Sequence, residues 1–209
     1  MPATAAIAFQ PRKTPIQTRS EATVDAILQA TLQVLVSVGK EKLTTTLVAH
    51  RAGVSVGTLY QYFPNKSALL QATLLRHMNH VITAVEAICK EKRGISIFDQ
   101  STALIDTWLD AKLNDVNNSA SLYAIASDVD GMRIAKNVAA RAFRHTTALF
   151  NTATERLNCD TELIATIVLA SISGVTRRLL EDKPTQKLLP QIREHLVTMT
   201  HAYLKTCIR

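Results

Sequence analysis

Glycine and proline are scarce in this sequence, with six of each among 209 residues. These two residues are the main local breaks in regular secondary structure, so their scarcity leaves room for long uninterrupted elements. Between them, apolar residues recur at a helical spacing, and no segment shows the alternation of a half-buried strand. The sequence therefore predicts an all-α protein.

Cysteine is also rare, with Cys89, Cys159 and Cys207 far apart and no CxxC spacing. An odd and scattered set argues against both a disulfide framework and a zinc site. His77 and His80 lie three residues apart on one predicted helix, but no nearby carboxylate completes a ligand set. We expect neither a bound metal nor a cofactor.

Long apolar runs are absent, because none approaches the roughly 20 residues of a membrane span. The longest candidate, residues 163–175, is interrupted by Thr166, Ser171 and Ser173 and is predicted to be a buried or interface helix. The N-terminus lacks a charged stretch followed by an apolar one, so no secretory signal is expected. These features favour a cytoplasmic protein.

Catalytic signatures are missing too: there is no nucleophile elbow, phosphate-binding loop or HExxH motif, so we expect no enzyme. The net charge of +7 permits a nucleic-acid partner without proving one. Residues 1–70 carry seven basic and three acidic side chains, so the charge density is highest in the N-terminal third.

The helical pattern divides the chain into a mobile basic tail (1–18), an N-terminal helical domain (19–66) and a second domain (67–209) that begins with a connecting helix (67–90). The polar stretch 90–94 is a further candidate boundary. Outside residues 43–63, we predict helices over 20–37, 66–90, 96–113, 120–129, 131–157, 161–181 and 185–205, with Gly39 ending the first.

Residues 43–63 have the pattern of two short helices joined by a tight turn. Thr44 and Ser55 are placed to cap the two helices through their hydroxyl groups. Gly53 lies where the chain must turn with a positive φ. Leu59 and Phe63 are expected to face inward. A helix, a short turn with glycine and a second helix form the arrangement that reads DNA in the major groove.

This stretch resembles the tetracycline-repressor (TetR) family of bacterial regulators over about residues 19–70, a quarter of the chain. The resemblance rests on Ile27-Leu28-Gln29-Ala30, Gly39, Thr44 to Ala49, Ala52-Gly53-Val54-Ser55, Gly57-Thr58-Leu59-Tyr60, Tyr62-Phe63, Lys66 and Leu69-Leu70. It implies contacts to base edges or to the DNA backbone by Thr44, Thr45, Thr46, Ser55, Val56, Gly57, Thr58, Tyr60, Gln61, Tyr62 and Lys66.

Two of these positions make the expected reading face unusual. Val56 and Gly57 offer no side-chain hydrogen bond to a base, so specificity is expected to rest partly on DNA shape. Lys66 begins a long helix, where the helix dipole disfavours a cation, and a bound phosphate would remove that conflict.

Trp108 lies between Asp106 and Asp110 on one predicted helix of the second domain, which suggests a ligand pocket. The tryptophan would stack on a flat ligand, and one of the acids would pair with its positive charge. The candidate lining residues are Phe98, Asp106, Trp108, Tyr123, Met132 and Phe143. The alternative is one buried tryptophan flanked by solvated acids.

The helix over 161–181 carries a broad apolar face with small residues among the large ones. In the resembling family the last two helices form a dimer interface, which implies interface roles for Ile164, Ile167, Val168, Ser171, Ile172 and Val175. The alternative is that this face packs only within the chain.

Together these features predict a homodimeric regulator that binds palindromic double-stranded DNA. By analogy with the family, we expect a repressor that a small-molecule effector releases through the connecting helix. Two alternatives stay open: a DNA-binding protein without an effector, architectural or controlled by a protein partner, and a helical-bundle enzyme with a vestigial DNA-binding domain.

Overall fold

The computed structural model describes residues 15–182 and 188–209, and its elements are helices apart from one isolated antiparallel bridge between Leu157 and Ile208. The all-α prediction is confirmed. The helices are α1 (Pro15–Lys42), α2 (Thr45–Ala52), α3 (Val56–Tyr62), α4 (Lys66–Glu91), α5 (Ile97–Leu113), α6 (Val116–Ile125), the short 3₁₀ helix η1 (Ala126–Asp128), α7 (Gly131–Phe150), α8 (Thr161–Asp182) and α9 (Leu189–Thr206).

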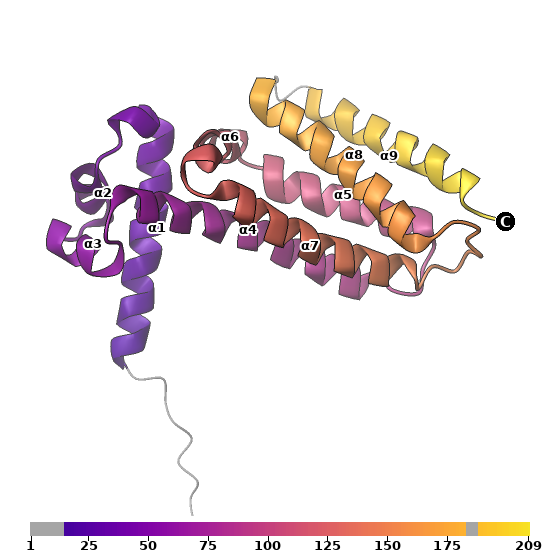
Figure 1. The fold of residues 1–209 in the computed structure, drawn as a ribbon, viewed down its shortest axis with the longest axis horizontal. Helices are drawn as coiled ribbons and strands as arrows, with labels where there is room; N and C mark the ends of the chain where they lie inside the picture. The colour runs from indigo at the N-terminus through magenta and orange to yellow at the C-terminus, as the bar shows by residue number, and fades with distance from the viewer. Residues whose placement is uncertain (1–14, 183–187) are drawn as a thin grey trace, which may run out of the picture.

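Figure 1 shows two parts joined by α4. Helices α1, α2 and α3 gather around the beginning of α4, and α5 to α9 extend with the rest of α4 as an elongated bundle. In the bundle α4 packs against both α5 and α7, while α8 and α9 lie on the far side of α5.

Helix α1 begins at Pro15, inside the segment predicted to be a mobile tail. Proline suits the first turn of a helix because the missing N–H would have no partner there. The rest of that predicted tail, residues 1–14, lies outside the described residues. The predicted break at Gly39 is confirmed: its φ is 76°, and one more helical turn follows it up to Lys42.

The start of α6 and the end of α7 differ from the prediction. Helix α6 begins at Val116, not at 120, because the Asp115 carboxylate caps it by accepting a hydrogen bond from the Asn118 N–H at 3.0 Å. Helix α7 ends at Phe150, not at 157. The segment beyond it instead pairs with the C-terminus, where the Asn158 N–H donates to the Cys207 carbonyl at 2.9 Å.

Helix α9 begins at Leu189, with a proline in its first turn. The prediction placed this start at residue 185, and residues 183–187 lie outside the described part of the chain.

The structure has two apolar cores, and α4 contributes to both. Its first half buries Leu69, Leu70 and Leu74 with α1, α2 and α3, and its second half buries residues such as Val81 and Val85 in the bundle. Residues 90–94 are therefore the end of α4 and the turn that leads to α5, within the bundle, and the prediction of a domain boundary there is wrong. A polar run marks solvent exposure, which a loop and a linker share.

The N-terminal core also takes in residues from the junction of α6 and α7. Leu122, Ile125, Val129 and Ile134 pack with the side chains of α1 to α4, far from them in sequence. A salt bridge of 2.8 Å between Lys40, at the end of α1, and Asp128 of η1 lies at the same contact. The α6–η1–α7 corner thus joins the bundle to the N-terminal part.

Two segments, Ser20–Lys42 and Thr161–Glu181, are helices whose length and mean hydropathy, 1.4 and 1.6, would suffice to cross a membrane. Core helices of globular proteins meet the same criteria, and 33% and 39% of the residues in these windows are buried in the fold. By themselves they are weak evidence for a membrane protein.

Gly131 is the tightest point of the α6–η1–α7 corner, because a Cβ there would overlap the backbone carbonyl oxygen of Ala126. We expect Gly131→Ala to lower the free energy of unfolding by about 1–3 kcal/mol, the usual cost of overpacking. Urea denaturation followed by circular dichroism measures it. Gly57→Ala is the control, since its Cβ would meet only the Ser55 Oγ at 3.7 Å. If both substitutions lower the free energy of unfolding equally, Gly131 is not the closely packed position proposed here.

Candidate DNA-binding surface and ligand cavity

Local hydrogen bonds define the helix-turn-helix. Thr44 Oγ1 accepts from the Leu47 N–H at 3.2 Å and caps α2, and Ser55 Oγ accepts from the Thr58 N–H at 3.0 Å and caps α3. Gly53 takes φ 68° between the two helices, a backbone conformation that favours glycine. Leu59 is fully buried and holds α3 against the core. The predicted caps, turn and inward positions of this motif are confirmed.

The outer face of the motif is open to solvent. Exposed residues are Thr44, Thr46, Ser55, Gly57, Tyr60 and Gln61, and partly buried ones are Thr45, Val56, Thr58 and Tyr62. The hydroxyl groups of Tyr60 and Thr45 lie 3.1 Å apart and link α3 to the start of α2. Tyr62 instead points toward α1, where its hydroxyl accepts from Ser20 at 3.2 Å. The structure thus brings ten of the predicted DNA-contacting positions onto two neighbouring helices and their caps.

Lys66 behaves differently from the expectation. Its ammonium donates to the backbone carbonyl of Lys40, in the last turn of α1, at 2.7 Å. A carbonyl at a helix C-terminus carries partial negative charge, so it satisfies the cation within the chain. The conflict with the dipole of α4 is relieved without the phosphate that the sequence suggested, and Lys66 ties α4 to α1.

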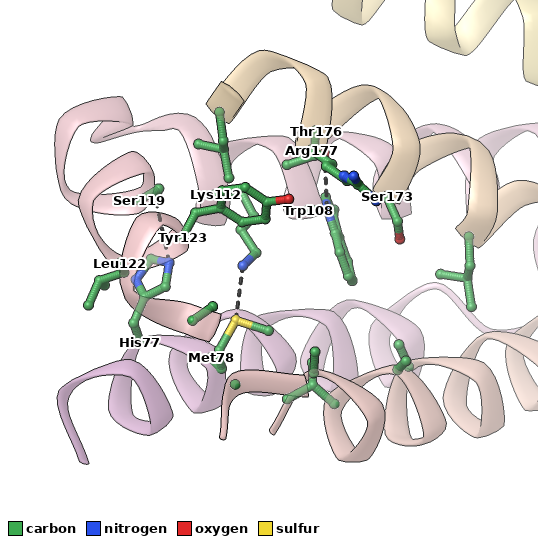
Figure 2. Close-up of a pocket in the computed structure, with 18 of the residues that line it drawn as sticks. His77, Met78, Trp108, Lys112, Ser119, Leu122, Tyr123, Ser173, Thr176 and Arg177 are labelled. Carbon is green, nitrogen blue, oxygen red and sulfur yellow. Dashed lines mark hydrogen bonds between the residues drawn. The ribbon is translucent and has the colours of Figure 1, made fainter. Parts of the chain in front are cut away.

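A cavity of about 520 Å³ lies inside the bundle between α4, α5, α6, α7 and α8. Its walls are mostly apolar, and Figure 2 shows the side chains of Trp108 and Lys112 reaching into it from α5. The Trp108 Nε1–H donates to the Thr176 Oγ1 at 3.2 Å, which fixes the ring against α8. Several lining residues of α7 and α8, including Ala139 and Ala170, are exposed, so the cavity opens between those two helices.

Three of the six predicted ligand-contacting residues line this cavity: Trp108, Tyr123 and Phe143. The other three do not. Met132 is 83% exposed on the outer face of α7, and Phe98 packs edge-on against His201 of α9, with ring centroids 5.1 Å apart. Both are large apolar residues, and that property does not determine which face of a helix they occupy.

Asp106 points away from the cavity with Asp110, and both carboxylates form ion pairs with Arg193 of α9, Asp106 at 2.6 Å. Residues two apart on a helix do not share a face, so Trp108 and its acidic neighbours face different partners. The predicted pairing of an acid with a cationic ligand beside Trp108 is wrong for this reason.

Lys112 is a cavity residue that the sequence prediction missed. Burial lowers the pKa of its ammonium to about 8. Its hydrogen-bond partner is the Met78 Sδ, at 3.0 Å, and among the described residues it forms no ion pair. Its position four residues after Trp108 on α5 was the signal that could have identified it, since such residues share a helix face.

The predicted dimer residues divide into two groups. Ile164, Val168 and Ile172 are buried in the bundle core of the single chain, so for these three the intrachain alternative holds. Ile167 is 41% exposed, and Ser171 and Val175 are partly buried. An open groove follows α8 and α9, lined by Gly174, Val175, Arg178, Leu179, Gln191, Ile192, His195, Leu196 and Met199.

Two family models match the chain. The model of bacterial regulatory proteins of the tetR family matches residues 27–73, and that of the tetracyclin repressor-like C-terminal domain matches residues 99–204, which is half of the chain. The protein belongs to the TetR family of transcriptional regulators.

Individual TetR-family relatives match only part of the chain. The transcriptional regulator BetI of Pseudomonas aeruginosa is 30% identical over 89 residues, 43% of this chain and 43% of BetI. The repressor KstR of Rhodococcus jostii is 46% identical over 55 residues, 26% of each chain. The chain therefore spans less than half the length of these relatives.

Among solved structures, a TetR-family regulator of Mesorhizobium loti superposes with a TM-score of 0.76 at 18% identity, covering 91% of this chain and 99% of the other. At that identity the likeness concerns the fold, and it extends over most of both chains.

The buried ammonium of Lys112 should cost this TetR-family protein stability. We expect Lys112→Met to raise the free energy of unfolding at pH 7 by about 1–3 kcal/mol, because an unpaired cation is removed from an apolar wall. The usual lysine pKa of 10.5 falls to about 8 in the folded chain. Between these values the unfolded chain binds more protons, so the wild type gains stability as the pH rises from 8 and the advantage of the variant shrinks.

Urea denaturation at pH 7, 8.5 and 10 measures this difference. Lys136→Met, on the exposed surface of α7, is the control and should show no such trend. A Lys112→Met variant that is less stable than the wild type at pH 7 would contradict the burial cost.

Proposed function

We propose that this protein is a homodimeric, sequence-specific transcriptional repressor that a small-molecule effector releases from a palindromic operator. The observation that carries the proposal is the helix-turn-helix, whose α3 stands exposed on a fully packed support in a chain of the TetR family. Such a regulator works in the bacterial cytoplasm, as we propose for this one.

On DNA, α3 would enter the major groove with Val56, Gly57, Thr58 and Gln61 toward the base edges. Val56 suits a thymine methyl group, and the bare Gly57 allows close approach. Tyr60 and the threonines that begin α2 would contact phosphates, as their exposure permits. Tyr62 and Lys66 would act by holding α3 and α4 against α1, in keeping with their partners Ser20 and Lys40.

The groove along α8 and α9 would be covered by the same groove of a second copy. Its support is an unpartnered apolar surface that includes Val175, Ile192 and Met199, next to the small Gly174. The exposed Ile167 continues this surface toward the start of α8. A symmetric pair of chains would present two recognition helices to successive major grooves, about 34–36 Å apart.

The cavity would hold the effector, and its position suggests how an occupant changes DNA binding. Leu74 of α4 and Leu122 of α6 both line the cavity and belong to the N-terminal core. An occupant that displaces either wall must therefore repack the support of the helix-turn-helix. Ligand and operator would then select different arrangements of α4, so that each weakens the binding of the other.

We expect selection from random-sequence DNA to yield a palindrome that binds two copies of the chain, with an affinity that falls steeply with salt. Tyr60→Phe should weaken binding by about tenfold, the loss of roughly one hydrogen bond to phosphate. Fluorescence anisotropy of the selected duplex measures both. The control is Lys136→Met, which lies on α7 outside the DNA-binding surface.

Binding without preference for any selected sequence would contradict the proposal and favour an architectural DNA-binding protein. No binding to DNA at all would defeat both.

A further inference from the structure

The cavity has an unbalanced set of charges. Among its lining residues are the cationic side chains Lys112 and Arg177, and no aspartate or glutamate. The remaining polar groups include the imidazole of His77, the indole N–H of Trp108 and a few hydroxyl groups. An apolar cavity with positive charge and no carboxylate among its described lining residues favours a negatively charged ligand.

The two cations differ in how they are satisfied. Arg177 lies on the exposed side of α8, and its guanidinium is neutralised by Glu181 at 2.9 Å. Tyr123 donates to the same carboxylate at 3.0 Å. Lys112 lies deeper, and the thioether of Met78 that it contacts is only a weak acceptor. Among the described residues, the inner cation is thus the one that lacks a strong partner.

The neighbours of Lys112 do not compensate its charge. Burial, and secondarily the charge of Lys112, lowers the pKa of His77 to about 4, so this imidazole is neutral at pH 7. Its Nε2 lies 3.4 Å from the Ser119 Oγ, and Figure 2 shows both groups at the same end of the cavity as Lys112. Together these side chains offer a cation, an imidazole and a hydroxyl group.

The opposite walls offer only apolar surface. Trp108, Phe143 and Leu169 present an aromatic and aliphatic lining from α5, α7 and α8. The volume of about 520 Å³ lies within the range that encloses a small organic molecule.

We propose that the cavity binds an apolar carboxylic acid, aliphatic or aromatic, whose carboxylate pairs with Lys112. The body of the acid lies along Trp108 and Phe143, and Ser119 donates a second hydrogen bond to the carboxylate. This inference rests on the proposed function, in which the cavity is the effector site, and it assigns the chemical class of that effector.

One carboxylate matches the site better than a more highly charged group. A single inner cation balances one negative charge, whereas a phosphate ester or diphosphate would bury further charge without a partner, at a high cost. A neutral ligand would leave Lys112 buried and unpaired in the complex. A cationic ligand would add repulsion to it.

Trp108 is the only tryptophan of the chain and therefore reports on the cavity directly. We suggest titrating the full chain at pH 7 with decanoate, decanamide and decylammonium, each below its micelle concentration, while following tryptophan fluorescence. The three probes share one alkyl chain and differ in charge. Decanoate should bind at least tenfold more tightly than decanamide, and decylammonium should bind least.

Two matched substitutions assign the preference to one cation. Lys112→Met, which removes the charge and shortens the unbranched side chain by one atom, should reduce the preference for decanoate over decanamide to less than threefold. Lys136→Met removes one positive charge at the exposed surface of α7 and should leave the preference unchanged.

Equal binding of decanoate and decanamide by the wild type would overturn the inference. Loss of the preference in Arg177→Met but not in Lys112→Met would also overturn it, because the anion would then sit at the mouth. A panel of acids from hexanoate to dodecanoate, with 2-naphthoate, covers other shapes, and failure of every acid to bind more tightly than its amide counts against the proposal.

Operator binding, measured by anisotropy on the same samples, reports on the proposed function separately. A chain that binds its palindrome but prefers no carboxylate refutes this inference alone.

Discussion

Helix α4 is packed into two apolar cores at once, and this constraint governs how the molecule can move. Leu69, Leu70 and Leu74 are buried beneath the helix-turn-helix, and Val81 and Val85 are buried in the bundle. Each such side chain contributes roughly 1.5–3 kcal/mol by its burial. Because α4 is anchored in both cores, a displacement of the helix in one core also displaces its side chains in the other core.

The cavity lies where these two cores meet, and its inner wall holds the buried ammonium group of Lys112. A cation without a carboxylate partner stands there beside an apolar chamber. Such an arrangement lowers the stability of the fold, and pairing of this cation with an anion would restore part of it. Stability given up at a binding site is a common trade against function.

Structural features that depend on residues close together in the sequence could be predicted from it, and those that depend on distant residues could not. The caps Thr44 and Ser55 and the turn at Gly53 are set by bonds within four residues, and they were predictable. Pairings across the chain were not. The hydrogen bond from Lys66 to the Lys40 carbonyl joins residues far apart in the sequence, and so does the packing of Leu122 beneath α1. No local sequence pattern indicates either contact.

The ligand cavity lies between these extremes. Trp108 was predicted as a stacking surface and does line the cavity, as do Tyr123 and Phe143. Phe98 and Met132 were predicted as further large apolar lining residues and lie elsewhere. Helical spacing separates Asp106 from Trp108 and joins Lys112 to it. This spacing predicts Lys112, and not Asp106, beside Trp108 in the cavity. The position of α8 over the cavity could be known only from the three-dimensional structure.

The coupling of the cavity to the DNA-binding surface is the central claim, and one linkage measurement tests it most directly. The affinity of the wild type for its selected palindrome should be measured by titration calorimetry, first alone and then with decanoate at a concentration that saturates the Trp108 signal. The account predicts that saturation weakens operator binding by at least tenfold, and that operator DNA weakens decanoate binding by the same factor. An operator affinity that stays unchanged at saturation would contradict it.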